Sequence, residues 1–214
     1  MTKLTVGIPV YEMRGIGVEY LNFLLNKLSD QTVFPYEILI SDNSTDKKIE
    51  NFIINYDSKI NLRYIKNYGA NDPCSNLNNI IKNSKSDYIK FIFQDDFPFS
   101  NNLLDKTIKA IQENPDKNWF VCGSNNSNDT ENFFNQIKPY FNNRIYLGKN
   151  TLGSPSVLTI KNSTESILFD TRFIWLLDCI YYYMLNKKFG PPVLIDETLV
   201  TCRIHTNQLT DVLD

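Results

Sequence analysis

The chain lacks the usual signs of a zinc cluster or of a nucleic-acid-binding surface. Its 214 residues include only 4 cysteines and 1 histidine, and the cysteines are widely spaced without a CxxC pair. This spacing argues against zinc, so we interpret the cysteines as buried free thiols in a reducing compartment. The formal net charge is −2, and no basic stripe is present. Nucleic acid is therefore not an expected partner.

Long hydrophobic runs are also scarce. The longest apolar run, over residues 173–185, is interrupted by Asp178 and is too short to cross a bilayer. No signal peptide precedes the first predicted strand. We therefore expect a cytoplasmic protein without a transmembrane segment, which leaves peripheral contact with a membrane open.

Glycine-rich loops that cradle phosphates are missing. A dinucleotide-binding fold would place GxGxxG directly after its first strand. Here that strand ends in Pro9-Val10-Tyr11, and Gly15 and Gly17 come too late and too sparsely. A P-loop is absent as well. If the chain binds a nucleotide, a metal ion held by carboxylates is the remaining common way to hold its phosphates.

Short strands alternate with helical patterns along the chain. Strands are predicted over residues 4–9, 37–41, 62–65, 88–93, 119–122, 157–160, 193–195 and 199–203. Helices are predicted over residues 21–31, 46–56, 77–81, 103–111 and 170–187, with a short one near 131–137. This order predicts an α/β fold with a mostly parallel, Rossmann-like central sheet flanked by helices. The rhythm breaks after residue 123, so we divide the single domain into residues 1–123 and 124–214.

Two adjacent carboxylates follow the fourth predicted strand. Residues 88–93 form an apolar strand, and Gln94-Asp95-Asp96 comes directly after it. Open α/β sheets bind ligands at the carboxyl ends of their strands. Paired carboxylates at such a place suit Mg²⁺ or Mn²⁺ carrying a phosphate. The alternative is that both residues only start a turn and cap the next helix.

Three sequence blocks resemble the family 2 glycosyltransferases of the GT-A fold. The blocks are TVGIPVY at 5–11, YEILISDNSTD at 36–46 and SDYIKFIFQDD at 86–96, with weaker matches at 153–156, 176–178 and 203–205. The resemblance implies transfer of a sugar, with inversion, from a nucleotide-diphosphate sugar such as a UDP-sugar. It also implies a glycan or glycolipid acceptor and a bound Mn²⁺ or Mg²⁺. Residues 1–123 would then bind the nucleotide-sugar, and the smaller C-terminal part, residues 124–214, would bind the acceptor.

The resemblance assigns donor-binding roles to residues of the first half. Pro9, Val10 and Tyr11 would line the site of the base and ribose. Asp42 would accept a hydrogen bond from the base. Asn78 would hold the donor side of the pocket.

The remaining implied roles concern the metal ion and the chemistry. Asp95 and Asp96 would form the family's DxD-like pair, one on the ion and the other on the ribose or on a metal-bound water. His205 would reach the metal or the pyrophosphate, and Asp178 would be the general base. Many members carry an acidic residue two positions before the metal ligand. Since that position is Gln94 if Asp96 is the ligand, and an apolar phenylalanine if Asp95 is, we favour Asp96.

Each of these residues also has an ordinary structural reading. Asp178 could face solvent on a helix whose other side is apolar, and a lone His205 could be a hydrogen-bonded structural residue. Trp175 and the cluster at 181–183 could stack on a sugar, although we interpret most of these aromatics as core. Arg203 could offset phosphate charge or pair with a carboxylate.

Two other functions stay open at this point. A sugar nucleotidyltransferase of related architecture would need a glycine-rich, basic loop after its first strand, and that loop is missing. A non-catalytic module that binds sugar-nucleotides or glycans within a larger protein is the second alternative.

Overall fold

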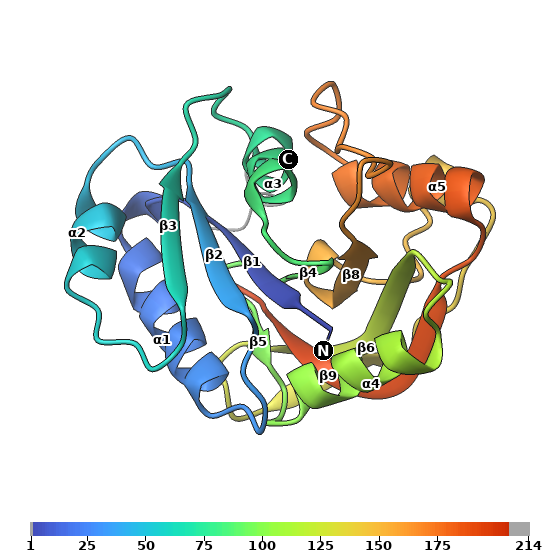
Figure 1. Ribbon diagram of the computed structural model, residues 1–214, viewed down its shortest axis with the longest axis horizontal. Coiled ribbons are helices and arrows are strands. Elements are labelled where there is room, and N and C mark those ends of the chain that lie inside the picture. Colours follow the sequence, from blue (N-terminus) through green and yellow to red (C-terminus); the bar gives the residue numbers. More distant parts are fainter. Residues whose placement is uncertain (1, 206–214) are drawn as a thin grey trace.

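Four parallel strands at one side of the sheet follow the alternating pattern. The computed structural model describes residues 2–205 and is shown in Figure 1. Its first strands are β1 (Leu4–Val10), β2 (Glu37–Asp42), β3 (Leu62–Lys66) and β4 (Tyr88–Phe91), in the order β3-β2-β1-β4. They are connected by α1 (Gly17–Ser29), α2 (Lys48–Ile54) and α3 (Pro73–Asn83). All the pairings among these strands are parallel, so their carboxyl ends meet at one edge.

The second half continues the same sheet with mixed strand directions. The order after β4 is β8 (Leu158–Lys161), β6 (Trp119–Ser127), β9 (Val193–Arg203) and β5 (Phe97–Pro98), and β7 (Phe133–Ile137) pairs with β6. β8 is antiparallel to both neighbours, whereas β9 is parallel to β6. Two further helices are α4 (Leu103–Glu113) and α5 (Leu177–Phe189). Within the described residues, short 3₁₀ turns occur at η1 (Met13–Gly15), η2 (Ile145–Leu147) and η3 (Pro155–Val157).

Helices cover both faces of the sheet, which confirms the predicted fold class. In Figure 1, α3 and α5 lie on the upper side of the sheet and α4 lies on the lower side. Residues 4–8 of β1, whose side chains alternate between the two faces of the sheet, are all buried, as expected for a strand covered on both faces. The division between residues 123 and 124 falls inside β6, which runs without a break from one half into the other. Among residues 2–205, no helix is long and apolar enough to cross a membrane.

Aromatic side chains of α5 form the core beneath the second half. The ring of Tyr182 stacks on that of Trp119 with 6.0 Å between their centroids. The Tyr181 ring lies 3.6 Å from that of Phe169. Both tyrosines are buried, which confirms the interpretation of these aromatics as core.

Two predicted helices are wrong in whole or in part. Residues 133–137 form strand β7 instead of a helix, because they supply an antiparallel partner to the open edge of β6. The helix predicted over 170–187 begins only at Leu177. The residue before it, Leu176, has a left-handed backbone with φ of 60°, which a helix interior does not allow. The two predicted strands at 193–195 and 199–203 form one strand, β9, with a register shift against Gly123.

Candidate active site

A cavity of about 590 Å³ opens at the carboxyl ends of β1 and β4. Pro9 lines it within the last residues of β1 and Tyr11 directly after that strand, and Asp95 and Asp96 line it after β4. The opposite wall is formed by residues 174–178, which lead into the first turn of α5 and end at Asp178. Of the residues predicted for the site, the cavity therefore brings together these five. The carboxyl edge of a parallel sheet is where the geometry of the fold leaves room for a ligand.

Asp95 and His205 lie side by side next to this cavity. The His205 Nε2 atom is 3.0 Å from the Asp95 Oδ2 atom, and the two side chains are 11% and 18% exposed. His205 comes two residues after the end of β9, which returns beside the β4 carboxyl end through its pairing with β5. A pair separated by 110 residues in the chain is thus held within hydrogen-bond distance.

Asp96 is placed differently from its neighbour. It is 5% exposed, its Oδ1 accepts a hydrogen bond from the Arg203 main-chain N–H, and its Oδ2 lies 3.4 Å from the Ser154 hydroxyl. Burial, followed by the nearby charge of Asp95, raises the pKa of Asp96 to about 7. Both carboxylate oxygens already have protein donors, so Asp96 is less available to a ligand than Asp95 is.

Arg203 holds the turn that carries the two carboxylates. Its Nε donates to the Asp95 main-chain carbonyl at 3.1 Å. Its guanidinium lies over the rings of Tyr20, Phe23 and Phe97, at 4.6, 4.9 and 5.3 Å from their centroids. Such stacking fixes the planar group, so we interpret Arg203 as a positioning residue.

Gln94 links the carboxylate turn to the loop after β1. Its Oε1 accepts from the Tyr11 main-chain N–H, and its Nε2 donates to the Gly17 carbonyl, both at 2.8 Å. The first atom of any side chain at Gly17 would lie only 2.4 Å from the Tyr11 carbonyl oxygen, so glycine is required there. Gln94 lines the cavity, and its amide is fixed in orientation by these two hydrogen bonds.

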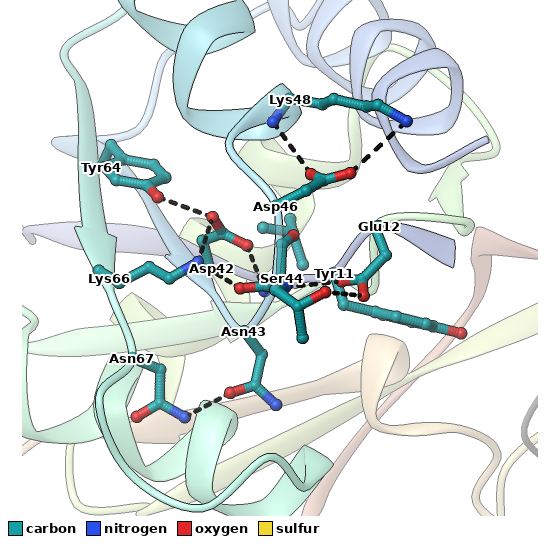
Figure 2. Close-up of polar contacts among 12 residues, drawn as sticks. Tyr11, Glu12, Asp42, Asn43, Ser44, Asp46, Lys48, Tyr64, Lys66 and Asn67 are labelled. Atoms are coloured by element: carbon teal, nitrogen blue, oxygen red, sulfur yellow. Dashed lines mark hydrogen bonds and ion pairs between the residues drawn. The ribbon is translucent and has the colours of Figure 1, made fainter. Parts of the chain in front are cut away.

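Asp42 is fully engaged within the protein at the end of β2. Its carboxylate accepts hydrogen bonds from the Tyr64 hydroxyl at 2.7 Å, the Lys66 ammonium at 3.1 Å and the Ser44 main-chain N–H at 2.7 Å (Figure 2). Asp42 is 0% exposed and does not line the cavity. In this arrangement a base cannot reach Asp42, contrary to the role implied by the sequence.

Two further predicted donor residues point away from the cavity. The Asn78 amide donates to the Phe169 carbonyl at 2.8 Å and accepts from the Phe169 N–H at 2.7 Å, which uses both of its ends. The Val10 side chain lies in the core. On α3, Pro73 and Asn76 line the cavity instead. The asparagine-rich helix gave a signal for such a residue, but the spacing alone did not select it.

Asp178 sits in the first turn of α5, at the cavity wall. Its Oδ2 accepts a hydrogen bond from the Asn150 amide at 2.6 Å, and its Oδ1 accepts from the Cys179 N–H at 2.7 Å. Burial raises the pKa of Asp178, and the hydrogen bonds oppose this rise. The carboxyl group thus faces a cavity rather than open solvent, in an environment that makes it a better proton acceptor than an ordinary aspartate.

The chain before Asp178 carries exposed apolar side chains. Ile174 and Trp175 line the cavity and are each 50% exposed, so Trp175 is not part of the core. The left-handed residue Leu176 separates them from α5. Sequence reasoning did not identify Ile174 as part of the site, and nothing in its local pattern distinguishes it from a core residue.

The donor set can be tested against a divalent ion. Among residues 2–205, no three His, Cys, Asp or Glu side chains gather into a metal cluster. Asp95 and His205 alone offer an oxygen and a nitrogen 3.0 Å apart, which is about the spacing of two adjacent ligands that each lie ~2.1 Å from one octahedral ion. The residues therefore fit an ion that takes two ligands from the protein and the rest from a bound diphosphate and water.

Comparison with known proteins identifies the family. The model of the family described as Glycosyl transferase family 2 matches residues 5–185. The chain belongs to glycosyl transferase family 2. This confirms the resemblance seen in the three sequence blocks, and the helix-flanked sheet agrees with the GT-A fold.

Similar proteins of this family are known in sequence and in structure. A poly(ribitol-phosphate) beta-glucosyltransferase of Bacillus spizizenii is 24% identical over 219 residues, which cover 98% of this chain and 28% of that protein. The structure of S. aureus TarS 1–349 in complex with UDP has a TM-score of 0.74 and 17% identity, covering 95% of this chain and 61% of that one. The mannosyltransferase PcManGT of Pyrobaculum calidifontis, solved with GDP-Man and Mn²⁺, has a TM-score of 0.65 and 12% identity, covering 95% and 56%.

These matches establish the family and the fold of the aligned part. The chain spans about a third of the length of the curated relatives it matches. The sequence identities to the solved structures are low, so the likeness to these structures shows only that the fold is shared.

Proposed function

We propose that this chain transfers a sugar from a UDP-sugar to a hydroxyl group of a glycan acceptor, by a metal-dependent single displacement that inverts the anomeric carbon. The observation that carries the proposal is one cavity with Asp95 on one side, held 3.0 Å from His205, and Asp178 on the other side. Asp95 and His205 suit an ion bound to the diphosphate, and the position of Asp178 suits a general base that acts on the acceptor hydroxyl. Residues 1–123 supply Asp95, and residues 124–214 supply His205, Asp178 and Asn150.

The donor half of the proposal is supported by the position of the carboxylate turn. Asp95 lies at the carboxyl end of β4, and Pro9 and Tyr11 lie at the end of the adjacent β1. A nucleotide whose base lies against Tyr11 would direct its diphosphate toward Asp95. UDP and UDP-GlcNAc are the ligands in solved complexes of TarS, which shares this fold.

Asp95 and His205 are the residues we propose as ligands of the ion. Asp96 instead stabilises the turn, since its oxygens accept hydrogen bonds from the Arg203 main-chain N–H and the Ser154 hydroxyl. A mixed oxygen and nitrogen pair favours Mn²⁺ over Mg²⁺, which prefers oxygen ligands. When bound, the ion would offset the negative charge that develops on the departing diphosphate.

Asp178 is the proposed general base. It would take the proton from the acceptor hydroxyl as that oxygen bonds to the anomeric carbon and the bond from that carbon to the diphosphate breaks. General-base catalysis of this kind typically contributes about 10²–10⁴-fold. The hydrogen bond from Asn150 holds the carboxylate in one orientation, and the elevated pKa strengthens it as a base.

Calorimetric titration of UDP tests the donor site and the ion together. UDP should bind wild type more tightly with Mn²⁺ than without it. Asp95→Ala should abolish this difference, and Asp105→Ala, an exposed aspartate in the first turn of α4, should leave it unchanged.

The outcomes separate the possible functions. UDP binding that is indifferent to Mn²⁺ in wild type would refute the metal part of the proposal. Mn²⁺-dependent UDP binding without release of UDP from UDP-glucose or UDP-GlcNAc, whether or not acceptor glycans are added, would favour the non-catalytic alternative.

A further inference from the structure

Asn76 carries a buried hydrogen-bond acceptor that no donor satisfies. It lies in the second turn of α3, is 4% exposed and lines the cavity. Its Nδ2 donates to the Val10 carbonyl at 3.1 Å. Its Oδ1 has no hydrogen-bond partner among residues 2–205. Buried polar atoms in folded proteins are almost always paired, so an unpaired one at a cavity wall points to a missing partner.

The orientation of this amide is fixed by its surroundings. The Val10 carbonyl oxygen can only accept, and it also accepts from the Asn43 main-chain N–H at 2.9 Å. The NH₂ end of Asn76 must therefore face Val10, because the opposite orientation would set two oxygens against each other. The Oδ1 atom is the end left for a ligand.

A second amide at the cavity is oriented by a chain of hydrogen bonds. The Gly69 main-chain N–H donates to Asn67 Oδ1 at 3.1 Å, so the Asn67 NH₂ group donates to Asn43 Oδ1 at 2.8 Å. The Asn43 NH₂ group in turn donates to Asn71 Oδ1 at 2.7 Å. Figure 2 shows the Asn67–Asn43 bond of this chain. The direction of every bond follows from the first, since a main-chain N–H can only donate, and it leaves the Asn71 NH₂ group as a donor. Asn43 and Asn71 both line the cavity.

These two amides are close neighbours at one end of the cavity. The Asn43 main chain and the Asn76 side chain donate to the same Val10 carbonyl oxygen, and Asn71 is bonded to Asn43. Tyr11, which follows Val10 and is 42% exposed, also lines the cavity and carries an aromatic ring. The residues that line this part of the cavity therefore include an unpaired acceptor on Asn76, a donor of fixed orientation on Asn71 and the aromatic ring of Tyr11.

We propose that Asn76 Oδ1 accepts a hydrogen bond from N3–H of a uracil and that the Asn71 NH₂ group donates to its O4 atom. This inference rests on the proposed UDP-sugar donor and assigns its base to residues other than Asp42, whose carboxylate is occupied by Tyr64, Lys66 and Ser44. Cytosine has the same size but the reverse pattern, with an acceptor at N3 and a donor amino group at N4. The site therefore selects uracil over cytosine.

Competing titrations of UDP and CDP test the assignment. Both ligands carry the same diphosphate, so with saturating Mn²⁺ their difference reports the base alone. Wild type should bind UDP at least about tenfold more tightly than CDP, the effect of one or two hydrogen bonds gained or mismatched. Asn76→Leu should bring the two affinities within about threefold of each other, mainly by weakening UDP.

Asn79→Leu is the matched control. Asn79 lies one helical turn further along α3, donates to the Ser41 hydroxyl at 2.9 Å and does not line the cavity. Its replacement should leave the UDP preference unchanged. UDP methylated at N3 provides a second arm on the unaltered protein, and it should bind at least about tenfold more weakly than UDP.

Equal affinities of wild type for UDP and CDP, or a UDP preference that survives in Asn76→Leu, would overturn the assignment. If Asn76→Leu fails to fold, the methylated nucleotide decides, and binding equal to that of UDP refutes the role of N3–H. Failure of wild type to bind either nucleotide would overturn the proposed function as well, so the two failures are distinguishable.

Discussion

Replacement of Asn78 by leucine separates a structural role from a ligand-binding role. The sequence implied a donor contact for this residue, whereas the structure uses both ends of its amide on the Phe169 main chain, at 2.8 and 2.7 Å. Asn78 and Phe169 are 6% and 2% exposed. Leucine has nearly the same size but forms no hydrogen bond. Asn78→Leu therefore leaves the buried N–H and C=O groups of Phe169 without partners.

The magnitude follows from those two main-chain groups. A buried main-chain group left without a partner costs about 1–3 kcal/mol, and the leucine side chain returns part of this through its apolar surface. We expect the free energy of unfolding to fall by about 3 kcal/mol. For a chain of this length the melting temperature should fall by about 6–12 °C. UDP affinity of the folded variant should change by less than about threefold, because Asn78 does not line the cavity.

Urea unfolding followed by circular dichroism measures this free energy, with linear extrapolation to zero denaturant. Asn83→Leu is the control, since Asn83 is an exposed asparagine at the end of the same helix. Its replacement should cost less than about 1 kcal/mol. A loss below about 1 kcal/mol for Asn78→Leu, together with tenfold weaker UDP binding, would refute the reasoning and restore a donor-binding role.

Three further predictions concern the chemistry and the metal site. Asp178→Asn should slow sugar transfer by about 10²–10⁴-fold while UDP binding is retained, and normal turnover of UDP-sugar by that variant would make Asp178 structural. Because burial raises the pKa of Asp178 and the base must be ionised, kcat/KM should fall with decreasing pH at a higher pH than for an ordinary aspartate. Asn150→Ala removes a hydrogen bond that favours the carboxylate, so the acidic limb of that profile should move to still higher pH, and movement the other way would contradict the assignment. Arg203→Lys keeps the charge but loses the planar group that stacks on three rings and bonds the Asp95 carbonyl, so calorimetry should show Mn²⁺ in the presence of UDP binding about tenfold more weakly. An unchanged Mn²⁺ affinity would show that Arg203 is not a positioning residue for the metal site.

Local patterns in the sequence predicted the strands that build the donor half. The apolar runs at β1, β2 and β4 can only be buried in a sheet covered on both faces, and the helical segments between them supply the cover. Parallel strands then bring their carboxyl ends to one edge, which places Pro9, Tyr11 and Asp95 around one cavity. Each of these inferences depends on residues that are close in sequence.

The predictions that failed depend on contacts between distant segments. Residues 133–137 were predicted as part of a helix but became a strand because β6 offered them an open edge. The asparagines at 76 and 78 differ by about 200° around an α-helix, so they face opposite sides. Both sides of α3 are covered, one by the strand ends and the other by the chain at Phe169, and the local sequence does not say which side faces the cavity.

The choice between Asp95 and Asp96 as the metal ligand depends on contacts between residues that are far apart in the sequence. The return of β9 brings the Arg203 main chain to Asp96 and the His205 ring to Asp95, across 107 and 110 residues. The sequence by itself indicated the family, the mostly parallel sheet flanked by helices and the presence of two carboxylates at its carboxyl edge. Only the tertiary structure decided which carboxylate accepts a hydrogen bond from the Arg203 main chain and which lies against His205, because the returning strand β9 brings both partners to the turn.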